Sequence, residues 1–229
     1  MRFRPTIIVL AAGSGSRFGS RIDSSPHKLA QTFGDSTVLG TTLAHAVQTQ
    51  LPVLVVTTDS LVSLAAGQLA SRDILVLSKP EAARGMGDSI AAGVAERSGA
   101  PGWLILPGDM PLVQPGTLLA VATALEQYAV VHAEHMGRRG HPAAFAAELY
   151  SELVKLQGDE GARRIIARYP AYGLDVADPG VLLDIDTAAD LELLRGKHAA
   201  ARGGAQAAVP ATIQEAAVPA GVKPVTRPA

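Results

Sequence analysis

The chain has 229 residues, of which 48% are hydrophobic and only 4% aromatic, a composition typical of one large globular domain or two small ones. Its 20 basic and 21 acidic residues nearly cancel, which argues against a protein that binds nucleic acid by neutralising many phosphates. Because cysteine is absent, disulfides, thiolate zinc sites, iron–sulfur clusters and cysteine nucleophiles are excluded. No apolar run reaches the roughly 18 residues of a membrane span, and the stretch 6–12 is too short for a signal peptide, so we expect a cytoplasmic protein without membrane contact.

Apolar runs of strand length recur in the first half of the chain, and they do not alternate with polar residues. This pattern favours parallel strands that are covered on both faces. The runs are residues 6–10, 51–56, 73–77 and 102–106. Segments with helical spacing lie between them, at residues 38–48, 60–70, 87–96 and 115–127. Strand and helix in alternation predict an α/β sheet, in which ligands bind beyond the carboxyl ends of the strands.

The pattern loosens after about residue 128. We expect this half to complete the same sheet with an antiparallel excursion, in a single domain over residues 1–198. The elements expected in order are a strand over 128–134, a basic loop over 136–140, a short apolar piece over 141–145, helices over 146–156 and 159–168, apolar segments over 172–176 and 181–185, and a last helix over 188–198.

The remaining residues, 199–229, include eleven alanines and four prolines but no aromatic residue. Such a segment cannot bury enough apolar area to offset the entropy that its ordering would cost. We therefore expect a disordered tail, whose simplest role is that of a spacer, although a linker or an interaction arm would have the same composition.

A glycine-rich loop, Leu10-Ala-Ala-Gly-Ser-Gly-Ser-Arg17-Phe-Gly19, follows the first strand. Glycines allow close backbone approach, and consecutive N–H groups can form a nest for an anion. The glycine spacing is not the dinucleotide fingerprint, and no Gly-Lys-Ser/Thr closes a P-loop. Arg17 and, further on, Lys28 add two cations that suit a polyphosphate. An ordinary strand-to-helix turn with a solvated arginine would explain the same residues.

Aspartates follow two of the later segments. Asp109 comes directly after the fourth apolar run, where it suits Mg²⁺, which binds one or two carboxylates together with phosphate oxygens. A turn-stabilising aspartate is the alternative explanation. If residues 183–187 were a strand, Asp184 and Asp186 would share a face; otherwise one would cap the last helix and the other would point into the cleft. Thr187, with Asp190 three residues on, is a credible cap, which leaves Asp186 as a second metal ligand.

Small residues begin the helix predicted over 87–96, in the sequence Gly85-Met86-Gly87-Asp88-Ser89. They would let a base or a ribose pack on the backbone, while a helix cap at Asp88 or Ser89 is the structural alternative. Cations and glycines also gather at 138–142 and 158–163, where an anionic second substrate could bind. His141 has a usable pKa near neutrality, but a histidine before proline is as often structural.

Taken in chain order, these motifs closely resemble the molybdenum cofactor nucleotidyltransferase family over residues 6–196. The resemblance implies a three-layer α/β/α, Rossmann-like fold of the glycosyltransferase-A type, with a mostly parallel sheet in a single domain. It also implies a Mg²⁺-dependent transferase that joins a nucleoside triphosphate to a phosphorylated pterin. The Gly85-Met86-Gly87 form is similar to the cytidylyl-transferring branch, which favours transfer of CMP from CTP to molybdopterin, with release of pyrophosphate, over guanylyl transfer from GTP.

The resemblance further implies a role for each motif residue. The nucleotide would be bound by Leu10, Ala11, Ala12, Gly13, Gly15, Ser16, Arg17, Lys28, Gly85, Met86 and Ser89. The acceptor would be bound by Arg139, Gly140, His141, Pro142, Asp159 and Arg163. Asp109 and Asp186 would bind the metal, and Arg17, Lys28 and Asp109 would be catalytic. A molybdenum enzyme or its maturation chaperone would be a further partner.

The chain departs from the family pattern in two places. Residues 20–27 separate Gly19 from Lys28, whereas the family's lysine follows the glycine after only a few residues. Either Lys28 still reaches the phosphates, or Arg21 has taken its task. After Asp186 the chain reads Thr-Ala-Ala-Asp, where the family commonly has Thr-Pro-Glu-Asp, and losing a proline at the first helical position weakens preorganisation.

Other functions are compatible with parts of the pattern. The same nucleotide half would serve a transferase acting on a sugar phosphate or a methylerythritol phosphate. A non-catalytic accessory protein that delivers the cofactor to a molybdenum enzyme would keep the fold as well. A Rossmann dehydrogenase with Asp59 as its ribose ligand is opposed by the glycine spacing.

Overall fold

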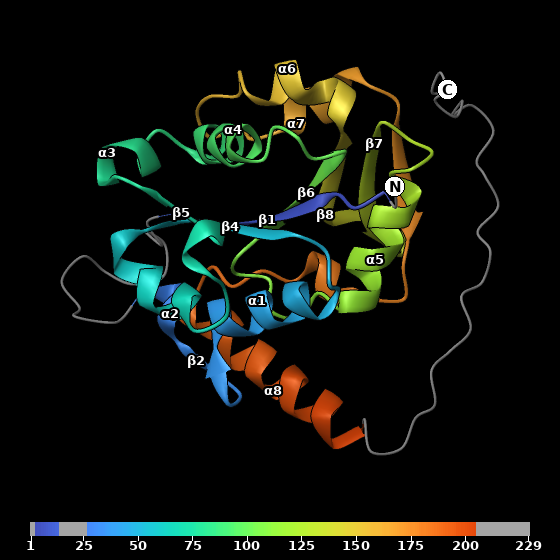
Figure 1. Ribbon diagram of the computed structural model, residues 1–229. Helices are drawn as coiled ribbons and strands as arrows, with labels where there is room; N and C mark the ends of the chain where they lie inside the picture. Colours follow the sequence, from blue (N-terminus) through green and yellow to red (C-terminus); the bar gives the residue numbers. More distant parts are fainter. Residues whose placement is uncertain (1–2, 14–26, 205–229) are drawn as a thin grey trace.

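The computed structural model describes residues 3–13 and 27–204, and a seven-stranded sheet with helices on both faces forms its centre (Figure 1). The order of strands across the sheet is β5-β4-β1-β6-β8-β7-β9. These strands are β1 (Thr6–Ala11), β4 (Val53–Thr58), β5 (Ile74–Leu77), β6 (Gly102–Pro107), β7 (Val130–His135), β8 (Arg138–Ala146) and β9 (Ala171–Asp175). A small hairpin of β2 (Thr32–Phe33) and β3 (Ser36–Thr37) lies outside this sheet.

The first half of the chain supplies the parallel part of the sheet, as the unbroken apolar runs predict. Strand β1 lies between β4 and β6 and is parallel to both, and β5 continues the parallel order beyond β4. Along β1 the side chains alternate between two cores, because Ile8 belongs to one core and Ile7 and Val9 to the other. Burial on both faces explains why these strands do not alternate with polar residues.

The expected antiparallel excursion is formed by β8, which runs antiparallel to both β6 and β7. A two-residue turn joins β7 to β8, and Met136 and Gly137 in that turn have positive φ values of 52° and 72°. Positive φ at both central residues is the geometry of the turns that match the twist of a hairpin. Strand β9 then pairs in parallel with β7 and ends the sheet.

Helices cover both faces of the sheet, so the prediction of a mostly parallel, three-layer α/β fold in a single domain is confirmed (Figure 1). One face carries α3 (Lys79–Ala82), α4 (Met86–Glu96), α6 (Tyr150–Leu153) and α7 (Arg163–Arg168), and the other carries α1 (Val38–Gln48), α2 (Val62–Ala66), α5 (Pro115–Ala124) and α8 (Ala188–Gly204). No helix within the described residues combines the length and apolar character needed to cross a membrane.

The end of the described chain settles one expectation and corrects another. Residues 183–187 are not a strand, which was one of the two alternatives for them; a 3₁₀ helix over Pro179–Leu182 precedes an irregular stretch. The buried carboxylate of Asp178 caps this 3₁₀ helix and connects it to the start of α5, because it accepts hydrogen bonds from the N–H groups of Gly180 and Gln114 at 2.9 Å each.

The last helix does not end at His198 but continues to Gly204, so residues 199–204 are helical rather than part of a disordered tail. Alanine has the highest helix propensity and extends the helix, whereas Gly203 and Gly204 favour its end. Residues 205–229, for which the disordered tail was also predicted, lie outside the described residues, and the domain boundaries stay a prediction.

Candidate active site

The carboxyl ends of β1 and β6 lie side by side, since Leu10 pairs with Pro107 in the sheet. Beyond them, the N–H group of Gly108 donates a hydrogen bond to the Leu10 carbonyl at 2.8 Å. A Cβ atom at Gly108 would lie 2.9 Å from that carbonyl, so the close approach requires glycine. The hydroxyl of Thr42 on α1 donates to the Gly108 carbonyl at 3.0 Å. These bonds fix the loop that carries Asp109 against the loop that carries Gly13.

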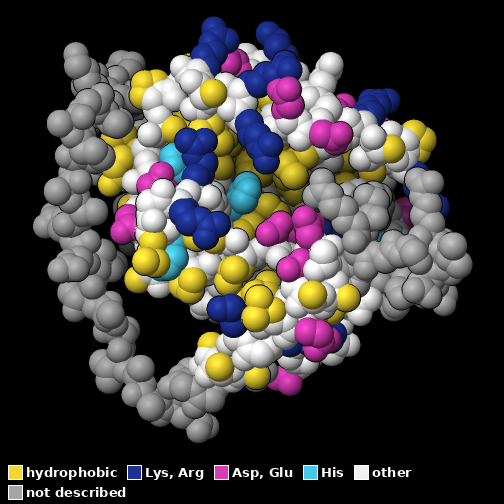
Figure 2. Space-filling model, turned by 180° about the vertical axis from the view of Figure 1, so that it is seen from behind, with side chains coloured by type: hydrophobic (Ala, Val, Ile, Leu, Met, Phe, Trp, Pro, Cys, Tyr) yellow, Lys and Arg dark blue, Asp and Glu magenta, His cyan; other side chains and the backbone are white. Residues whose placement is uncertain are grey.

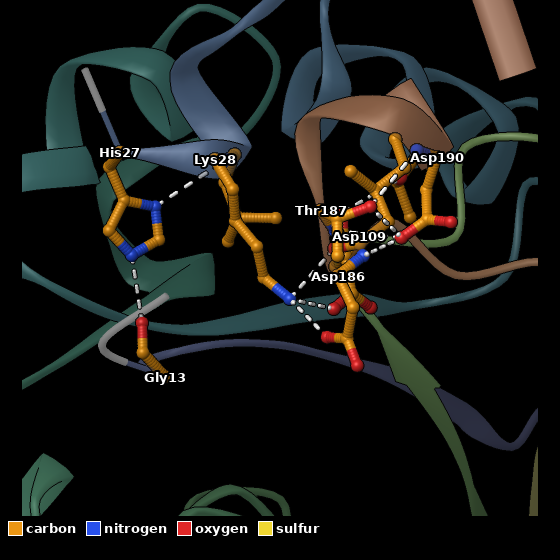
Figure 3. Close-up of polar contacts among 11 residues, drawn as sticks. Gly13, His27, Lys28, Asp109, Asp186, Thr187 and Asp190 are labelled. Carbon is orange, nitrogen blue, oxygen red and sulfur yellow. Dashed lines mark hydrogen bonds and ion pairs between the residues drawn. The ribbon is translucent and has the colours of Figure 1, made fainter. Parts of the chain in front are cut away.

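Lys28 brings the two predicted metal-binding aspartates to one point (Figure 3). Its Nζ lies 2.6 Å from Asp109 Oδ2 and 3.2 Å from Asp186 Oδ1, and it donates to the Ile185 carbonyl at 2.9 Å. Burial by itself would lower the pKa of Lys28, but the two carboxylates outweigh it and hold that pKa above its usual range. The lysine therefore carries a full positive charge at neutral pH.

A capping box at the start of α8 positions Asp186. The Asp190 carboxylate accepts from the N–H groups of Thr187 and Asp186 at 2.7 and 3.2 Å, and Thr187 Oγ1 accepts from the Asp190 N–H at 3.2 Å. The hydrogen bonds from Thr187 hold the pKa of Asp190 below its usual value. Thr187 is thus the helix cap that the sequence predicts, and Asp186 is directed at Lys28 (Figure 3).

Asp184 is a third carboxylate in this region, and the motif reasoning gave it no role. Burial raises its pKa, and the charges of Asp109 and Asp186 raise it further. Within residues 3–13 and 27–204, however, no three His, Asp or Glu side chains are grouped so that they alone could hold a metal ion.

The residues around Lys28 have the chemistry that Mg²⁺ requires. Asp109, Asp186 and the Ile185 carbonyl all present oxygen atoms within hydrogen-bonding distance of one cationic group. Mg²⁺ prefers oxygen ligands and usually keeps water or substrate phosphate in part of its coordination shell. Two carboxylates and a carbonyl therefore fit such an ion if a bound substrate completes the shell.

His27 is a site residue that the sequence reasoning missed. Its Nε2 lies 2.8 Å from the Gly13 carbonyl, and its Nδ1 accepts a hydrogen bond from the Leu29 N–H at 3.2 Å. In this way it joins the residues on either side of the predicted phosphate-binding loop. Gly15, Ser16 and Arg17 of that loop, which were predicted to bind the nucleotide, lie outside the described residues.

The predicted base-binding segment packs directly against the loop at residues 157–159. The Gly87 N–H donates to the Gly158 carbonyl at 2.7 Å, and the Gly158 N–H donates to Asp88 Oδ2 at 2.8 Å. A Cβ atom at Gly85 would collide with Gly158, and one at Gly87 would lie 2.8 Å from the Gln157 backbone. Gly85 also has a φ of 122°, which favours glycine. Packing between these two loops is therefore sufficient reason for both glycines.

The remaining members of this segment differ in exposure. Ser89 is buried, and its hydroxyl donates to the Gly85 carbonyl at 3.4 Å, which is a local contact within the helix start. Met86 is exposed and lies beside Gly161. A hollow of about 430 Å³ next to the segment is lined by Arg84, Asp88, Gln157 and Gly158.

One residue of the predicted acceptor set, His141, is affected by the charge of Asp109. Burial lowers the pKa of His141, while the charge of Asp109 acts to raise that pKa and the charge of Arg163 acts to lower it. His141 thus lies within the electrostatic reach of both residues. Its peptide bond to Pro142 is cis, and the preceding Gly140 leaves no room for a Cβ atom beside the Val181 carbonyl.

Two other predicted acceptor residues, Arg139 and Asp159, lie on different elements of the fold. Arg139 is exposed and pairs across the β7–β8 hairpin with Glu134, and Asp159 lies beside Gly85 at the start of α4. On the face seen in Figure 2, acidic side chains gather next to a histidine and are bordered by arginine and lysine side chains. Cationic groups that can attract an anionic ligand therefore border the acidic group on that face.

A mostly parallel α/β sheet with a charged site beyond its strand ends defines a Rossmann-like protein with a polar ligand site. Residues 7–172, more than half of the chain, match the model of the MobA-like NTP transferase domain. The chain belongs to this family, which confirms the resemblance to the molybdenum cofactor nucleotidyltransferases.

Individual relatives are similar over parts of the chain. The purine catabolism protein PucB of Bacillus subtilis is 36% identical over 121 residues, which are 50% of this chain and 58% of that protein. The phosphoenolpyruvate guanylyltransferase of Nocardia farcinica is 37% identical over 121 residues, or 49% of this chain and 52% of that protein. The chain thus matches somewhat more than half the length of these curated relatives.

Among solved structures, Rv0371c of Mycobacterium tuberculosis is similar with a TM-score of 0.71 and 28% identity, over 84% of this chain and 98% of that one. A structure of Rv0371c in complex with manganese has a TM-score of 0.69 and 27% identity over the same shares of the two chains.

Proposed function

We propose that the protein transfers CMP from CTP to the phosphate of molybdopterin or of its molybdenum cofactor and releases pyrophosphate. The observation that carries this proposal is the contact of Lys28 with Asp109 and Asp186 beyond the strand ends, in a chain of the MobA-like NTP transferase family. Two carboxylates suit a metal ion, and a cation beside them suits the triphosphate that the metal ion accompanies.

In this reaction the acceptor phosphate is the nucleophile. One of its oxygens forms a bond to the α-phosphorus of the nucleotide, in line with the bond to the β-phosphate that breaks, and the electron pair leaves with pyrophosphate. The protein needs no nucleophile of its own, so catalysis consists of positioning and charge stabilisation. The backbone of Leu10–Gly13 would hold the triphosphate, and Lys28 would neutralise the charge that builds on the pyrophosphate. Arg17 would share that task.

A divalent ion, Mg²⁺ in this proposal, would be held by Asp109 and Asp186. It would supply charge neutralisation for the phosphate oxygens when bound. The manganese complex of Rv0371c supports a divalent ion in a related protein.

The segment at Gly85, Met86 and Ser89 would contact the base or the ribose, with Met86 the exposed member. His141 and Arg163 would hold the acceptor near Asp109, since the charges of Asp109 and Arg163 both act on His141. Gly140 and Pro142 would shape the acceptor site beside His141, and Arg139 and Asp159 would lie at its border.

GTP is the alternative nucleotide, and a different phosphorylated acceptor is the alternative substrate. The relative from Nocardia farcinica supports both alternatives, because its name describes guanylyl transfer to phosphoenolpyruvate. A cofactor carrier without catalytic activity is less well supported, because Lys28, Asp109 and Asp186 are all present and in contact.

Two measurements test the proposal. Thermal unfolding with Mg²⁺ and either CTP or GTP should show a larger midpoint shift with CTP, since a ligand that binds the native state stabilises it. Pyrophosphate release should then require a phosphorylated pterin, with sugar phosphates and phosphoenolpyruvate as comparison acceptors. Pyrophosphate release with GTP but not with CTP would favour guanylyl transfer. Nucleotide binding without pyrophosphate release for any acceptor would favour the cofactor carrier.

A further inference from the structure

The side chain of His27 spans from the helical turn that carries Lys28 to Gly13, two residues after β1 (Figure 3). Its Nε2 is 2.8 Å from the Gly13 carbonyl, and its Nδ1 is 3.2 Å from the backbone nitrogen of Leu29. One imidazole ring therefore contacts the backbone of Leu29, two positions after it, and that of Gly13, 14 positions before it in the sequence.

The hydrogen bonds determine which ring nitrogen carries the proton. The Leu29 N–H can only donate, so Nδ1 must accept and be unprotonated. In the neutral ring the proton is then on Nε2, which donates to the Gly13 carbonyl. The two contacts thus have separate roles: Nδ1 caps the 3₁₀ helix over Lys28–Ala30, and Nε2 connects that helix to Gly13.

We infer that His27 is a positioning residue, which sets the location of Lys28 relative to the Ala12–Gly13 backbone through its Nε2 contact. This inference rests on the proposed function, in which those two groups bind the same triphosphate. Chain connectivity alone does not fix their separation, because residues 14–26 lie between Gly13 and His27 and a longer connection constrains its ends less.

Three variants separate the two contacts. Glutamine places its amide nitrogen near the position of Nε2 and keeps a donor for Gly13, but it lacks the acceptor at the Nδ1 position. Asparagine keeps an acceptor near the Nδ1 position for Leu29 and does not reach Gly13. Alanine removes both contacts. His198→Gln, on α8, makes the same chemical change outside the site and is the matched control.

The readouts are the dissociation constant of the magnesium–nucleotide complex by calorimetry and the KM and kcat for nucleotide, with the unfolding midpoint as a check on folding. We expect His27→Ala and His27→Asn to weaken nucleotide binding by about three- to tenfold, the effect of one lost hydrogen bond, with the acceptor KM unchanged. His27→Gln should regain most of the wild-type affinity.

Several outcomes would overturn the inference. If His27→Asn binds nucleotide as well as the wild-type protein and His27→Gln does not, the role of His27 is local capping of the 3₁₀ helix. An equal loss of affinity in all three variants, or no loss in any of them, would also contradict the inference. A fall in the unfolding midpoint that accounts for the weakened binding, and that His27→Gln does not reverse, would mean a merely structural role. If the wild-type protein binds no nucleotide at all, the proposed function fails instead, so the two failures are distinguishable.

Discussion

The ammonium group of Lys28 lies 2.6 Å from Asp109 Oδ2, although 81 positions separate the two residues in the sequence. Both side chains are largely shielded from water, with 13% of the Lys28 side chain and 18% of the Asp109 side chain exposed. Screening by solvent is weak for such a pair, so their attraction is stronger than that of a surface ion pair. Lys28 is therefore an internal counter-ion for the carboxylates that are proposed to bind metal.

Replacing Asp109 should abolish most of the activity and leave the fold intact. We expect Asp109→Ala to lower kcat on the order of a hundredfold, because it removes one preorganised electrostatic partner of the reacting phosphates. Lys28 keeps Asp186 as a partner, so the fold should persist, but the loss of a largely shielded ion pair should lower the unfolding midpoint. Asp59→Ala, at an exposed aspartate after β4, is the control and should retain wild-type turnover. Near-normal turnover in Asp109→Ala would refute the assignment of this residue.

Replacing Lys28 by methionine should make metal binding easier and the metal-free protein less stable. Without the ammonium group, the carboxylates of Asp109 and Asp186 repel each other, which we expect to lower the free energy of unfolding by about 1–3 kcal/mol. Added Mn²⁺ should raise the unfolding midpoint more in Lys28→Met than in the wild-type protein, because the competing cation is gone. An equal or smaller Mn²⁺ shift in the variant would show that the metal does not share the position of Lys28.

The start of α4 packs so closely against the 157–159 loop that Gly87 cannot be replaced by a residue with a side chain without a loss of stability. Gly87→Ala would place a Cβ atom 2.8 Å from the Gln157 backbone, and we expect this to cost about 1–3 kcal/mol of stability. The displaced loop should raise the KM for nucleotide and for acceptor together, since the proposed binding segments touch there. Gly116→Ala on α5 is the control, because a Cβ atom there has open space. A change in only one of the two KM values would mean that the loops act independently.

Buried histidines should make the protein less stable in mild acid. Burial lowers the pKa of His132, which is only 3% exposed; the Glu134 carboxylate opposes this shift and the charge of Arg139 adds to it. The unfolded chain, with a histidine pKa near 6.5, takes up the proton first, so stability is lost as pH falls below about 6.5. His132→Gln keeps a donor for Glu134 and should reduce the slope of unfolding free energy between about pH 7 and pH 5. An unchanged slope would exclude His132 as a source of this acid sensitivity.

Local patterns in the sequence were sufficient for most of the fold. The apolar runs that predicted strands became β1, β4, β5 and β6, and the helix predicted over 38–48 has those bounds. These strands and helices could be predicted because burial on both faces and helical periodicity determine which neighbouring residues are apolar. The capping role of Thr187 followed in the same way, because its partner Asp190 is three residues away.

The resemblance predicted that Asp109 and Asp186 meet at one site, but only the tertiary structure decided which atoms of the distant residues contact one another. The motifs named Lys28, Asp109 and Asp186, but no pattern indicated that one ammonium group contacts both carboxylates, or that Gly87 is bonded to Gly158. His27 was treated as part of an insertion, and its contact with Gly13 is visible only when both ends of that segment are placed. The contacts between side chains of different segments depend on how the strands are ordered across the sheet. The residues of one segment do not by themselves indicate which other segment packs beside it.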